Sequence, residues 1–121
     1  MSKTVQIEPN NWKEFLEEFS ARNNNRRARF EVFRNRETEE EETEAHLEDV
    51  SLKPNGDKND VVVIRIDRAK SDAEKIKDII TNIRGISVQY DTDGSEDVLE
   101  ITDNQNTLIN LRMESKVDGV S

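Results

Sequence analysis

The spacing of hydrophobic residues near the start of the chain predicts an α-helix. Apolar residues recur there at the interval that places them on one helical face, namely Trp12, Phe15, Leu16 and Phe19. Asn11 precedes this stripe as a candidate N-cap, and Glu14 occupies the capping-box position three residues later. Asparagines at 23–25 suit the left-handed conformation that follows many helices. We therefore expect a helix over residues 11–21 whose apolar stripe plugs the core.

From Arg26 onward the period becomes two, which is typical of strands with one buried face. Ala28, Phe30 and Val32 alternate with charged residues, so a strand is expected over 26–34. Further segments of strand character are 46–53, 61–67, 86–90, 98–102 and 108–113. Glycine- and asparagine-containing segments between them predict tight turns at 54–57, 93–95 and 104–106.

Residues 71–84 allow two interpretations. Ser71 and Glu74 match a capping box, and the isoleucines that follow have helical spacing. A segment so rich in isoleucine also suits a strand, because β-branched side chains pack well on a pleated sheet. We favour a short helix here and keep the strand as the alternative.

These elements predict an α+β fold in a single domain over 1–121. The N-terminal amphipathic helix packs on a twisted antiparallel sheet of five or six strands, with a second short helix near 71–84. Residues 35–46 include six glutamates within eight positions, which repel one another and predict a mobile acidic loop. The polar tail 114–121 is expected to be frayed.

Composition narrows the function classes. Asp and Glu number 27 against 18 Lys and Arg, which gives a formal net charge of −9. Such a chain is repelled by phosphate backbones and anionic headgroups, so we expect neither nucleic acid nor a membrane as partner. There is no cysteine, which excludes disulfides and thiolate metal sites. Together with the lack of a long apolar run, this predicts a cytoplasmic location.

Residues that could carry catalysis are few. His46 is the only histidine and stands beside a glutamate run, which indicates an exposed titrating group rather than a zinc ligand. Residues 89–100 partly match a calcium loop around Gly94, but Gln89 replaces the first carboxylate and a hairpin turn fits better. Scattered carboxylates such as Asp67 or Asp78 could serve an enzyme, yet nothing selects a pair. We predict no catalytic, metal or cofactor-binding residue and no cofactor.

Arginine is concentrated between 22 and 36, the one basic patch of an acidic chain. Arg26, Arg27 and Arg29 are therefore candidate partner-binding residues, because guanidinium groups suit an acidic segment or a phosphate. Alternatively, they pair with the chain's own glutamates. The function itself is unknown from the sequence: a small non-enzymatic protein-binding or regulatory module is favoured. The alternatives are a small-molecule or metal-binding domain and an enzyme with an unrecognised carboxylate site.

Two segments carry a resemblance to a known family. The run Pro9-Asn10-Asn11-Trp12, continued by Phe15, Phe19 and Ser20, is similar to the opening Pro-x-x-Trp-x-x-Phe-x-x-Phe-Ser-like run of small uncharacterised bacterial proteins. The segments 99–103 and 107–112 resemble the final strands of that family, a domain of unknown function. The resemblance implies that 75–80 is a strand, and it implies no activity.

Overall fold

The computed structural model describes residues 3–34, 37–41, 45–67 and 74–114. Within these residues one α-helix and nine strands form the fold. In chain order the elements are β1 (Lys3–Ile7), a 3₁₀ turn (Pro9–Asn11), α1 (Trp12–Asn23), β2 (Arg27–Arg34), β3 (Glu37–Glu41), β4 (Ala45–Asn55), β5 (Lys58–Asp67), β6 (Glu74–Ile80), β7 (Ile83–Tyr90), β8 (Glu96–Asp103) and β9 (Leu108–Met113).

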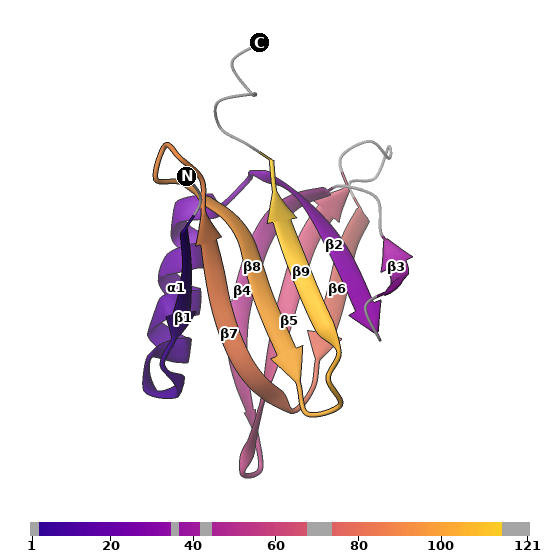
Figure 1. The fold of residues 1–121 in the computed structure, drawn as a ribbon. Coiled ribbons are helices and arrows are strands. Elements are labelled where there is room, and N and C mark those ends of the chain that lie inside the picture. The colour runs from indigo at the N-terminus through magenta and orange to yellow at the C-terminus, as the bar shows by residue number, and fades with distance from the viewer. Residues whose placement is uncertain (1–2, 35–36, 42–44, 68–73, 115–121) are drawn as a thin grey trace.

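All strands belong to one antiparallel sheet that folds over on itself. The strand order is β1-β7-β8-β9-β2-β4-β5-β6, and β3 pairs with β2 beside this path. β2 pairs with β9 from Ala28 to Phe33 but meets β4 only at Arg27 and Ala28. The sheet therefore divides there into a front layer (β1, β7, β8, β9 and β2) and a back layer (β4, β5 and β6), as Figure 1 shows.

The helix closes one side of this two-layered sheet. α1 packs against β4 of the back layer. In Figure 1 it lies at the side of the molecule where β1 forms the edge of the front layer. The hydroxyl of Ser20 donates to the carbonyl of Val50 at 2.7 Å and accepts from the Val50 N–H at 2.7 Å. A helix side chain thus satisfies backbone groups on the β4 edge that would otherwise be buried without partners.

Most of the apolar helical stripe expected from the sequence is buried in the core between the layers. Trp12 is 6% exposed, Leu16 and Phe19 are fully buried, and all three belong to one buried cluster that includes residues of both layers. Phe15 differs, because it is only partly buried and packs at the margin of the core. Asn11 is the N-cap residue of α1, as expected, but its side chain makes no capping hydrogen bond. The 3₁₀ turn Pro9–Asn11 leads directly into the helix.

The α+β class is confirmed, but the expected five or six strands are too few and the second helix is wrong. Of the segment 71–84, residues 74–80 form β6 and β7 begins at Ile83, while 71–73 lie outside the described residues. β6 pairs with β5 along its length, from Val61 opposite Ile80 to Asp67 opposite Glu74. Pairing with a β-branched neighbour overrides the local helical spacing of the isoleucines.

The acidic segment also differs from the expected loop over 35–46. Residues 37–41 form β3 and β4 already begins at Ala45, whereas 35–36 and 42–44 lie outside the described residues. β3 pairs with β2, placing Glu41 opposite Glu31 and Glu37 opposite Arg34. The open edge of β2 supplies backbone partners there, which the glutamate pattern alone does not reveal. Of the predicted frayed tail, only Glu114 is described.

Candidate functional site

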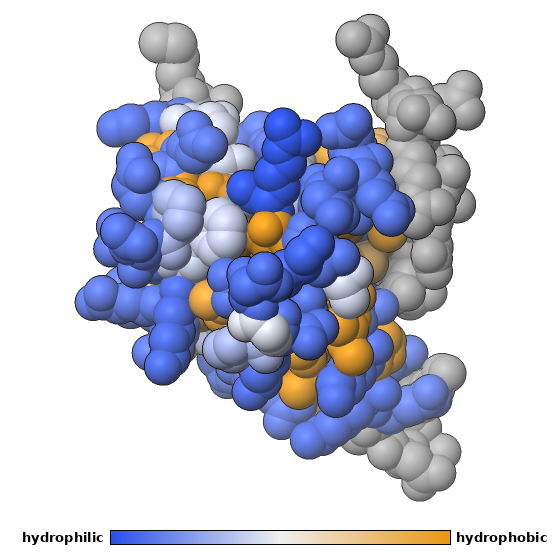
Figure 2. Space-filling view, turned by 90° about the horizontal axis from the view of Figure 1, so that it is seen from below, coloured by the Kyte–Doolittle hydropathy of each residue, from blue (hydrophilic) through white to orange (hydrophobic). Residues whose placement is uncertain are grey.

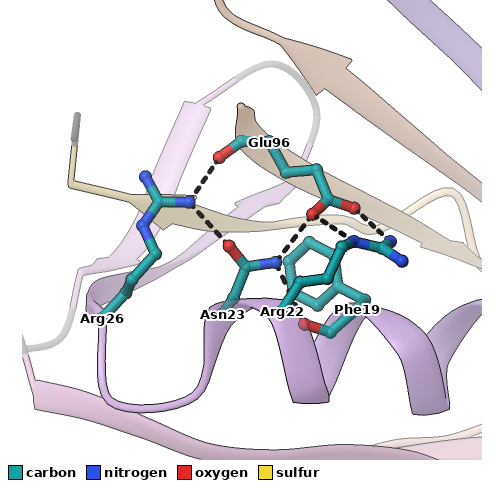
Figure 3. A network of polar contacts seen from close by, with 5 residues as sticks. All are labelled: Phe19, Arg22, Asn23, Arg26 and Glu96. Carbon is teal, nitrogen blue, oxygen red and sulfur yellow. Dashed lines mark hydrogen bonds and ion pairs between the residues drawn. The ribbon is translucent and has the colours of Figure 1, made fainter. Parts of the chain in front are cut away.

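The first of the predicted partner-binding arginines, Arg26, takes part in a network inside the protein (Figure 3). Its Nη1 donates to Asn23 Oδ1 at 2.7 Å and to the Glu96 carbonyl at 2.8 Å. Its Nη2 donates to the carbonyl of Glu114. Partial burial lowers the pKa of Arg26 below its ordinary value. This guanidinium joins the end of α1 to β8 and to the end of β9.

Glu96 is the centre of the same network and is 5% exposed. Its carboxylate accepts two hydrogen bonds from Arg22, at 3.0 and 2.7 Å, and one from Asn23 Nδ2 at 2.9 Å. The hydrogen bond to Glu96 raises the pKa of Arg22, against an opposing effect of burial. No local pattern could have indicated this pairing, because Arg22 and Glu96 are 74 residues apart.

The other two predicted partner-binding arginines, Arg27 and Arg29, lie on β2. Arg27 is exposed and its Nη1 lies 3.7 Å from a carboxylate oxygen of Glu114. Arg29 pairs in the sheet with Arg112, whose Nε is 3.3 Å from a Glu31 carboxylate oxygen. Carboxylates are therefore interleaved with these arginines, which weakens the positive field that an acidic partner would meet.

A different surface combines an open strand edge with a hollow. We call it the β1–α1 groove; its volume is about 440 Å³, and it is lined by Val5, Gln6, Ile7, Glu8, Asn11, Glu14, Phe15 and Glu18. A second hollow, of about 590 Å³, shares Phe15 and Glu18 with it and extends to Arg22 and Tyr90. The two together follow one side of α1 from its first turn to its last.

The outer edge of β1 lies beside this groove and is bonded by α1 at its last residue, Ile7. β1 ends the strand order and pairs only with β7 among the described strands. The indole N–H of Trp12 donates to the carbonyl of Ile7 at 3.0 Å, so that carbonyl points toward α1. Backbone groups of antiparallel strands alternate in direction, so Lys3 and Val5 present theirs on the same side. On the opposite side of α1, Ser20 covers the edge of β4.

The charges of the groove are acidic over most of its length. Glu8, Glu14 and Glu18 are exposed carboxylates along its margin, while the half-buried Val5 and Phe15 supply an apolar floor. The only basic residue along α1's groove side is Arg22, whose carboxylate partner is the buried Glu96. The groove therefore combines an apolar floor with a negatively charged margin.

A further hollow lies at the lower end of the molecule, between β6 and the front layer. Its volume is about 320 Å³, and its apolar lining consists of Phe30, Val32, Ile79, Ile80 and Ile109. Figure 2 shows this end, with orange patches between hydrophilic side chains. The carboxylates at the margin of this hollow bond to other groups of the protein. Asp103 Oδ1 accepts the N–H groups of Gln105 and Thr107, both at 2.9 Å, and Asp78 pairs with buried Arg65 at 3.2 Å.

The residues that the sequence offered for metal binding or acid–base chemistry lie apart from one another in the described part of the chain. No group of three or more His, Asp or Glu side chains is gathered there to hold a metal ion. The segment 91–95 is the hairpin turn between β7 and β8, with Asp93 Oδ1 accepting the Ser95 N–H at 2.9 Å. His46 is half-buried on β4, opposite Ile66. In the described part of the chain, no helix has the length and apolar character that a membrane crossing needs.

Comparison with known proteins places the chain in a family. It belongs to DUF5335, a family of unknown function, whose model matches residues 3–120. The resemblance expected from the two ends of the sequence is confirmed to this extent. No curated protein and no solved structure matches the chain.

Proposed function

We propose that the protein is a protein-binding module that takes up an extended, basic segment of a partner as an additional strand on β1. The observation that carries the proposal is the open edge of β1 beside a groove with an apolar floor and an acidic margin. Strand addition to an exposed sheet edge obtains affinity from backbone hydrogen bonds and specificity from side-chain pockets. The proposal keeps the non-enzymatic binding role that the sequence favours.

The surrounding charge supports a basic partner rather than a second copy of the chain. With a formal net charge of −9, two copies repel each other, whereas a basic segment is attracted over several ångströms. Lysine or arginine stems can cover Phe15 while their charged ends reach Glu14 and Glu18. The lack of cysteine agrees with a protein that performs this role in the cytoplasm.

The arginines of β2 support a second, weaker candidate surface. Arg27 is exposed, so an acidic partner could still approach it beside Glu114. Arg26 does not share this role in the proposal, because its guanidinium is engaged by Asn23 and by two backbone carbonyls. The acidic groove is favoured because it joins charge to an open backbone edge and an apolar floor, whereas the arginines offer charge alone.

A labelled peptide tests the proposed function. The probe is a fluorescein-labelled heptapeptide of alternating threonine and lysine, and binding is followed by fluorescence anisotropy at low salt. We expect saturable binding that the double variant Glu14→Lys/Glu18→Lys weakens about tenfold or more, because two attractions become repulsions. Glu17→Lys is the matched control for the single variants Glu14→Lys and Glu18→Lys: it makes the same charge change as either of them, at an exposed position of α1 outside the groove, and should alter the affinity less than twofold.

Two results would overturn the proposal. One is the absence of saturable binding of the lysine peptide to the unaltered protein. The other is equal weakening by Glu17→Lys and by either single groove reversal, which would mean that net charge alone attracts the peptide. A peptide of alternating threonine and glutamate completes the comparison and should not bind.

A further inference from the structure

We infer that the β1–α1 groove selects a partner segment with two basic residues separated by one residue. The inference rests on the proposed function and adds which sequence the groove prefers. It follows from the spacing of two carboxylates on α1 relative to the spacing of side chains on an added strand. Glu14 and Glu18 both line the groove and both are exposed.

The two spacings agree closely. Glu14 and Glu18 are four residues apart on α1, so they are separated by about 6.0 Å along the helix axis. Residues i and i+2 of a strand lie on the same face and are about 6.6 Å apart. Each carboxylate can therefore face one basic residue of such a pair. Adjacent basic residues would point to opposite faces of the added strand, and only one of them would face α1.

The floor between the carboxylates fits the stems of those basic side chains. Phe15 lines both hollows, and its ring is partly exposed. Aliphatic portions of lysine or arginine can lie on that ring, which removes apolar surface from water while the charged ends remain hydrated beside the carboxylates. The residue between the two basic positions faces away from α1, so the groove leaves it unselected.

Arg22 limits how far a basic run can extend. Its guanidinium carbon lies 5.9 Å from the centre of the Phe15 ring, and its side chain bonds Glu96. It follows Glu18 by one helical turn, where the next same-face residue of the added strand would lie. A third basic residue at that end would meet a positive charge, so the preferred segment has a basic pair at the Glu14 and Glu18 end and a neutral residue beside Arg22.

Three heptapeptides of identical composition test the spacing. Each has five threonines and two lysines, with the lysines at positions 3 and 5, at 3 and 4, or at 3 and 6; affinities are measured by NMR titration of the isotopically labelled protein. We expect the 3-and-5 peptide to bind about fivefold more tightly than either isomer, since one additional exposed ion pair is worth up to about 1 kcal/mol.

Variants separate this inference from the proposed function. Glu18→Gln should abolish the preference for the 3-and-5 peptide, whereas the matched control Glu17→Gln should retain it, because Glu17 lies outside the groove. Equal affinities of the three isomers for the unaltered protein would overturn the spacing inference and leave strand addition standing. Persistence of the preference in Glu18→Gln would overturn it too. If no isomer binds and the alternating lysine peptide also fails, the proposed function itself is wrong.

Discussion

Phe19→Ala should lower the free energy of unfolding by about 3–5 kcal/mol, as for other fully buried phenylalanines. Phe19 has no exposed surface and packs between the two layers with Trp12 and Leu16. Its removal takes away buried apolar surface and leaves a cavity that the paired strands on either side cannot close. Urea denaturation followed by circular dichroism measures the change, which is a large part of the stability of a small domain.

Phe15→Ala is the matched comparison on the same helical stripe. The Phe15 ring is 6.0 Å from that of Phe19 but is partly exposed in the groove, so its loss should cost only about 1–2 kcal/mol. Equal destabilisation by the two substitutions would contradict the placement of Phe15 at the margin of the core, and with it the apolar floor of the groove.

Arg65→Ala should also destabilise the protein by about 3–5 kcal/mol, because it removes a large, fully buried side chain together with its ion pair to the partly buried Asp78. Arg65 is fully buried; its Nη2 lies 3.2 Å from Asp78 and its guanidinium carbon 5.5 Å from the centre of the Phe30 ring. The substitution leaves the Asp78 carboxylate without this partner and opens a cavity between the layers. The same denaturation experiment measures the loss.

Arg84→Ala controls for the loss of an arginine as such. Arg84 is exposed and bonds Asn106 at 3.3 Å, so its replacement should change stability by less than about 0.5 kcal/mol. A loss below about 1 kcal/mol for Arg65→Ala would mean that Arg65 does not hold the two layers together.

Much of the fold could be predicted because local patterns and tertiary packing agree there. The helical stripe is buried at Trp12, Leu16 and Phe19, and the turn before β5 has Gly56 at a φ of 65°. Asn25, just past α1, has a φ of 75°, as the asparagine run suggested. In these places the residue types that form the local structure are also the ones that the core or the turn requires.

The sequence misled where a neighbouring strand decides the conformation. The isoleucines of 74–80 have helical spacing, yet pairing with β5 makes this segment β6. Residues 37–41 lack any apolar pattern, yet β2 offers them backbone partners and they form β3. Both outcomes depend on long-range pairing, which a local window does not contain.

The candidate site was only partly predictable for the same reason. Val5 and Ile7 alternate with polar residues, a short signal that could have indicated β1, but nothing local shows that its edge lies beside α1. The arginine concentration was visible, whereas the buried Glu96 that engages Arg22 is contributed by a distant strand. The periodicity of the helix likewise does not indicate that Phe15, unlike the other three residues of its stripe, lies at the groove rather than in the core.

The most direct test of strand addition is amide hydrogen exchange of β1, measured by NMR without and with a saturating amount of the alternating threonine and lysine peptide. The Ile7 carbonyl is bonded by α1, and backbone groups alternate in direction along the strand, so the N–H groups of Thr4 and Gln6 should face β7 and those of Val5 and Ile7 should not. In the free protein we therefore expect rapid exchange at Val5 and Ile7 and slow exchange at Thr4 and Gln6. Bound peptide should slow exchange at Val5 and Ile7 at least tenfold and leave Thr4 and Gln6 unchanged. Unaltered exchange at Val5 and Ile7 with the peptide bound would contradict strand addition on β1.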